Sequence, residues 1–143
     1  MSPIEVEIMR RKLAIIAENL ATLKPIETMT RAEYIKDVYK RKATERLLQE
    51  LIEAAIDINS HLIVQSSKAT PDDYYESFIK VGELGIISSN LAEKLAPSAG
   101  LGNRLVHEYD LLDHSLVLES VKMAEELYPC YIKEIEEYVS GKT

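Results

Sequence analysis

The apolar residues of this chain recur at steps of three and four, and this spacing limits the fold to packed helices. The first segment shows it over six positions: Val6, Met9, Leu13, Ile16, Leu20 and Leu23. Such steps place side chains on one face of an α-helix, because the helix turns once in about 3.6 residues. No stretch shows the sustained alternation of a strand or the Asn-Gly or Asp-Gly turn of a hairpin. The pattern therefore predicts an all-α protein.

Capping and breaking residues divide the chain into four main helical segments. We expect the first over about 3–23 and a long, widely buried second over about 38–66. Thr70 followed by Pro71 predicts the start of a third, with the hydroxyl as its cap. The last is expected to follow Asp113 and to contain Pro129.

Short connections between these segments favour an up-and-down antiparallel four-helix bundle with a short additional helix. Shorter helical pieces are expected after a capping box at 30–33 and around 88–107. At 143 residues the whole chain, 1–143, is expected to form one helical domain.

The composition excludes several classes of protein. The net charge is −7, which argues against a general nucleic-acid coat protein, since such affinity depends on many contacts between cations and phosphates. No apolar run approaches the roughly 20 residues that cross a bilayer. Cys130 is the single cysteine, so the chain holds no internal disulfide framework and no thiolate metal-ligand spacing. We expect a cytoplasmic protein with no metal, no other cofactor, no DNA partner and no membrane partner.

A cluster of polar side chains near residue 105 is the strongest candidate for a site. On a helix, Asn103 and His107 lie one turn apart on one face, with Arg104 about 60° from His107. Leu105 and Val106 are expected to point into a core. An imidazole that exchanges a proton near pH 7, beside a permanent planar cation, suits a site that handles phosphate.

The run GlyLeuGlyAsnArgLeuValHisGluTyrAsp at 100–110 resembles the signature of HepT-like proteins in the HEPN superfamily. These are ribonuclease toxins paired with a nucleotidyltransferase antitoxin. Their pattern is an arginine, a short spacer, a histidine, any residue and a tyrosine. His107 and Tyr109 match its end, and Asn103 matches the polar residue that usually follows the arginine. Gly102 stands where the arginine is expected, and Arg104 is too close to His107 for that spacing.

The resemblance extends over nearly the whole chain and implies a HEPN fold and the activity of a type VII toxin, a metal-independent endoribonuclease. RNA supplies its own nucleophile, the 2′-hydroxyl, so the protein needs only proton transfer and charge stabilisation. His107 would move protons and Asn103 would orient the phosphate or the imidazole. The available guanidinium is that of Arg104, which would act across the interface of a homodimer. The implied substrate is RNA, with tRNA among the candidates.

A second hypothesis is a catalytically silent binding module that is the partner and AMPylation substrate of a nucleotidyltransferase. The resemblance implies that Tyr109 receives the AMP, while a structural tyrosine packed on Leu105 is the simpler alternative. Gly102 also has two interpretations. Either a bare backbone lets a neighbouring helix approach closely, or the loss of the arginine has disarmed the site.

Overall fold

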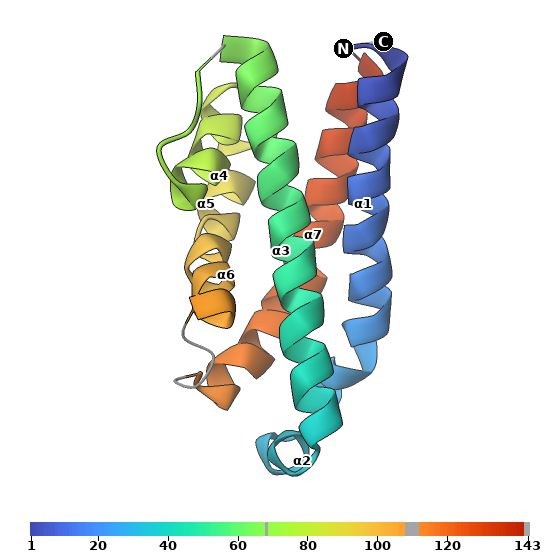
Figure 1. The fold of residues 1–143 in the computed structure, drawn as a ribbon, viewed down its shortest axis with the longest axis vertical. Helices are drawn as coiled ribbons and strands as arrows, with labels where there is room; N and C mark the ends of the chain where they lie inside the picture. The colour runs from blue at the N-terminus through green and yellow to red at the C-terminus, as the bar shows by residue number, and fades with distance from the viewer. Residues whose placement is uncertain (68, 108–111, 142–143) are drawn as a thin grey trace.

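The computed structural model describes residues 1–67, 69–107 and 112–141, which are helical and contain no strand. The elements are α1 (Pro3–Leu23), the 3-10 helix η1 (Lys24–Thr28), α2 (Arg31–Lys36), α3 (Val38–Ser67), α4 (Tyr74–Glu83), α5 (Ser89–Leu95), α6 (Ser98–His107) and α7 (His114–Gly141). Figure 1 shows that α1, α3 and α7 are long rods, while α4, α5 and α6 succeed one another along the opposite side of α3 from α1. The predicted bundle is confirmed, with its fourth side built from three short helices. None of the helices in the described ranges has the length and apolar character to cross a membrane.

Side-chain caps fix the starts of the first two helices as the sequence predicts. Ser2 Oγ accepts from the Glu5 amide at 3.2 Å, and the Glu5 carboxylate accepts from the Ser2 amide at 3.0 Å. Thr30 and Glu33 form the same reciprocal capping box. These bonds satisfy amides that the first turn of a helix otherwise leaves unpaired.

The predicted start of the third helix at Thr70 is wrong. Helix α4 begins at Tyr74, and its cap is Asp73, whose carboxylate accepts from the Glu76 amide at 2.7 Å. An ionised cap makes a shorter and stronger hydrogen bond than a hydroxyl, and its charge suits the positive end of the helix dipole.

Helix α4 ends in a Schellman turn. Gly85 has a φ of +74°, the left-handed region that favours glycine. Its amide bonds the Gly82 carbonyl at 3.1 Å, and the Ile86 amide bonds the Val81 carbonyl at 2.9 Å. The turn directs the chain from α4 into α5, which Ser88 caps.

A buried polar chain ties α7, α3 and α4 together. The Tyr131 hydroxyl donates to Asn59 Oδ1 at 2.6 Å and lies 3.1 Å from the Ala55 carbonyl oxygen. The Asn59 amide donates to Ser77 Oγ at 3.3 Å, and Ser77 donates to the Tyr74 carbonyl at 2.7 Å. Because an unpaired buried polar group is costly, this chain favours one register of the three helices.

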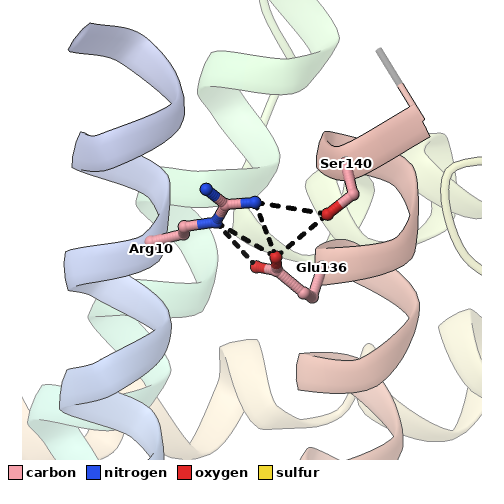
Figure 2. Close-up of polar contacts among 3 residues, drawn as sticks. All are labelled: Arg10, Glu136 and Ser140. Atoms are coloured by element: carbon pink, nitrogen blue, oxygen red, sulfur yellow. Dashed lines mark hydrogen bonds and ion pairs between the residues drawn. The ribbon is translucent and has the colours of Figure 1, made fainter. Parts of the chain in front are cut away.

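An exposed ion pair joins the first and last helices near the chain ends (Figure 2). Arg10 Nε donates to Glu136 Oε1 at 3.0 Å, and a second nitrogen of the guanidinium lies 3.2 Å from Ser140 Oγ. Ser140 also donates to Glu136 at 3.0 Å. The hydrogen bond from Arg10 lowers the pKa of the Glu136 carboxyl below its usual value.

The lowered pKa of the Glu136 carboxyl predicts how the stability of the fold depends on pH. The ionised carboxylate stabilises the fold above its unfolded pKa, and that stability is lost as the pH falls through the lower, folded pKa. Glu136→Gln should therefore lower Tm at pH 7 by at most about 4 °C, since an exposed pair is screened by solvent. Thermal unfolding from pH 7 to pH 3 should show the difference vanishing at the acid end and shrinking in high salt. Glu137→Gln, on the same helix, is the matched control, and a pH-independent difference would contradict the assignment.

Candidate functional site

Helix α6 packs closely on α3 at one of its positions, Gly102. Gly102 is buried, and a Cβ atom added there would lie 3.0 Å from Ile52 Cγ2. That distance is shorter than ordinary van der Waals contact, so either the methyl group or the helix would have to move. This tight contact favours the packing interpretation of Gly102 and leaves the loss of an arginine untested.

A groove of about 350 Å³ lies between α3, α6 and the start of α4, and we call it the motif groove. Its lining residues are Ile52, Glu53, Ile56, Asp57, Ser60, Tyr74, Gly102, Asn103, Val106 and His107. Asn103 and His107 are both exposed, and neither side chain makes a hydrogen bond within the described ranges. The structure brings this predicted pair together and leaves both groups accessible to a substrate.

The structure separates Arg104 from this pair. Arg104 lines a different pocket, on the side of α6 that faces α7. Leu105 is buried as predicted, whereas Val106 is 43 % exposed and lines the motif groove, so its predicted place in the core is wrong. Helix α6 presents both 103 and 106 to the groove because they lie one turn apart. Tyr109 lies outside the described residues.

The electrostatics of the motif groove differ from those expected of a phosphate site. Glu53 and Asp57 reach it from α3, and its lining includes no lysine or arginine. Lys12 Nζ lies 3.1 Å from Asp57 Oδ2 and so partly neutralises that carboxylate. Sequence reasoning missed these two acids, although their spacing of four places them on one helix face. The described lining of the motif groove in a single chain is therefore not positively charged.

The site can carry out proton transfer and positioning. An accessible imidazole near neutral pH can accept a proton from a hydroxyl or give one to a leaving oxygen. The neighbouring amide can donate to an oxygen of the same substrate. Within 1–67, 69–107 and 112–141, no three His, Cys, Asp or Glu side chains are grouped so that they could hold a metal ion.

Comparison with known proteins agrees with this architecture. A family model described as ribonuclease HepT-like matches residues 16–138. The chain is 37 % identical over 139 residues to the tRNA nuclease HepT of Aphanizomenon flos-aquae, covering 97 % of this chain and 95 % of that protein. It is also 32 % identical over 75 residues to the mRNA nuclease HepT of Shewanella oneidensis, covering 52 % of this chain and 56 % of that one.

Two solved structures share the fold. One is a toxin–antitoxin crystal structure with AMP-PNP, with a TM-score of 0.81 and 24 % identity over 92 % of this chain and 98 % of that chain. The other is a tri-AMPylated Shewanella oneidensis HEPN toxin in complex with its MNT antitoxin, also at a TM-score of 0.81 and 24 % identity, over 96 % and 99 % of the two chains. At this identity the structural similarity supports the HEPN-type helical fold alone. The match to the family model does not depend on that similarity. The chain belongs to the ribonuclease HepT-like family.

Proposed function

We propose that this chain is the toxin of a type VII toxin–antitoxin system, a metal-independent endoribonuclease that acts in the cytoplasm and is weakened by Gly102. The observation that carries the proposal is the placement of Asn103 and His107, the motif residues, in one accessible groove. The relative that is 37 % identical is a tRNA nuclease, so tRNA is the first substrate to test.

The proposed reaction uses the 2′-hydroxyl of RNA as its nucleophile. His107 accepts the proton of that hydroxyl while its oxygen attacks the adjacent phosphorus, and the Asn103 amide donates to a phosphate oxygen. The bond from phosphorus to the 5′-oxygen breaks, and the leaving oxygen takes up a proton. The products are a 2′,3′-cyclic phosphate end and a 5′-hydroxyl end. The charge that grows on the phosphate oxygens lacks the guanidinium that an arginine at 102 would supply.

A homodimer would supply what a single chain lacks. Two motif grooves that face one another would place two copies of His107 on one RNA strand, one as base and one as acid. Arg104, which lies outside its own chain's groove, would offer its cation to the groove of the other copy. Such a cation would offset the repulsion between phosphate and the Glu53 and Asp57 carboxylates. Light scattering that shows a monomer at micromolar concentration would contradict this arrangement.

Mapping the ends of cleaved RNA tests the nuclease proposal. Purified protein incubated with tRNA in EDTA should yield 2′,3′-cyclic phosphate and 5′-hydroxyl ends, because no step uses a metal. Cleavage that EDTA abolishes, or products that carry 5′-phosphate ends, would show a different reaction.

A specific observation favours a second candidate, a silent module modified by a nucleotidyltransferase. Gly102 packs against Ile52, and the groove lining holds two carboxylates and no cation, both unfavourable for stabilising a phosphorane. In this candidate the partner transfers AMP from ATP to the Tyr109 hydroxyl: an oxygen–phosphorus bond forms and pyrophosphate leaves. The related fold seen in an AMPylated toxin bound to its MNT antitoxin supports this assignment.

Mass spectrometry of the intact chain tests the modification. After incubation with the cognate nucleotidyltransferase, ATP and Mg²⁺, the chain should gain the mass of one or more AMP units. Tyr109→Phe should prevent the first addition. Tyr39→Phe, which changes a tyrosine that is 89 % exposed and remote in sequence, should not. Equal modification of both variants would exclude Tyr109 as the acceptor.

A further inference from the structure

A second cavity, separate from the motif groove, lies between α6 and α7 on a floor formed by α3. Its volume is about 320 Å³, and we call it the α6–α7 pocket. Its lining residues are Leu48, Leu51, Ile52, Lys94, Leu95, Pro97, Ser98, Gly100, Leu101, Arg104, Leu116, Ser120, Met123, Ala124, Leu127 and Tyr128. Most of these side chains are aliphatic, and Met123 remains 50 % exposed. The pocket is of the size and character of small-molecule sites, which are concave and mostly apolar.

Two cations line the same pocket. Lys94 and Arg104 are both exposed, and neither makes an ion pair or a side-chain hydrogen bond within residues 1–67, 69–107 and 112–141. An apolar cavity with two available cations is complementary to a molecule with an apolar body and one anionic head.

We propose that the α6–α7 pocket binds a small aliphatic carboxylate. Its head takes its countercharge from Lys94 and Arg104, and its tail lies among the aliphatic side chains. A cavity of about 150 Å³ holds one benzene, so this pocket holds a tail of roughly ten carbons. A nucleotide fits less well, because its base would leave several edge groups unpaired. The Ser120 hydroxyl, for example, already donates to the Leu116 carbonyl at 2.7 Å. This proposal does not depend on nuclease activity, but it uses Arg104, the cation that the proposed homodimer also uses.

Calorimetric titration with sodium decanoate, below its micelle-forming concentration, tests the proposal on the intact chain. We expect saturable binding of one decanoate per chain. Lys94→Ala and Arg104→Ala should each weaken it in low salt, whereas Lys122→Ala, an exposed lysine on α7 outside the pocket, should not.

Two further variants block the cavity. Ala124→Phe fills it, and Met123→Glu places a repelling carboxylate at a partly exposed wall and so leaves the core intact. Both should abolish binding. Decanoate that fails to bind, or that binds Met123→Glu as well as the unchanged chain, would overturn the proposal. So would AMP binding in place of decanoate, or a dimer that either variant converts to a monomer, because the pocket would then belong to a nucleotide or to a second copy.

Discussion

Combining Gly102→Arg with Ile52→Leu is expected to raise the rate of RNA cleavage by a factor of about 10²–10³. The arginine restores a fixed guanidinium at the motif groove, where it stabilises charge that grows only in the transition state. Leucine at 52 conserves the volume of isoleucine but lacks the Cγ2 methyl, the group that a Cβ at 102 would meet at 3.0 Å. Initial rates on tRNA, measured in EDTA, compare the double variant with Ile52→Leu alone.

The single variants separate chemistry from packing. Gly102→Arg alone should be less stable than the unchanged chain by about 1–3 kcal/mol, because it overpacks a buried contact, and its gain in rate should be smaller. Ile52→Leu alone should change stability by less than about 1.5 kcal/mol and leave the rate unchanged. If the double variant folds and dimerises but cleaves no faster than Ile52→Leu, the missing cation is not what limits this protein.

Replacing His107 with alanine is expected to lower the cleavage rate by a factor of about 10²–10⁴, the usual contribution of one general acid or base. The side chain is exposed and makes no hydrogen bond in the described ranges, so its removal should leave Tm essentially unchanged. The effect is clearest in the background of Gly102→Arg with Ile52→Leu, where the starting rate is higher. Single-turnover rates together with thermal unfolding distinguish lost chemistry from lost fold.

Val106→Ala is the matched control for this substitution. Val106 lines the same groove from the neighbouring position and is similarly accessible, but it carries no group that transfers a proton. The cleavage rate of Val106→Ala should stay within a few-fold of that of the starting protein. If His107→Ala and Val106→Ala lose activity equally, the groove binds RNA by shape, and proton transfer must be assigned to another residue.

Local patterns predicted the helices well, because caps and periodicity act over a few residues. The bounds of α1 and the capping box at Thr30 follow from such signals. The start of α4 does not, since 70–73 contains three residues that are able to cap. The choice of Asp73 accompanies the docking of α4 on α3 through Ser77 and Asn59, a contact between distant segments.

In the candidate site, too, local patterns were predictable and contacts between distant segments were not. The helical repeat predicted that Asn103 and His107 share a face, and they share one groove. It could not predict that Glu53 and Asp57 would line that groove, because this depends on how α3 packs against α6. The role of Gly102 likewise depends on Ile52, a contact that no local window contains.

Because Gly102 contacts Ile52, the effect of a substitution at one of these positions depends on the residue at the other. The Cγ2 methyl group of Ile52 lies against the backbone of Gly102. An arginine that arises first at 102 therefore brings a steric penalty together with its catalytic benefit. A change that arises first at 52 removes the obstacle but brings no benefit of its own. Under the proposed function, the full benefit of a cation at 102 therefore depends on a second change at 52, because Gly102→Arg alone combines a gain in rate with a loss of stability.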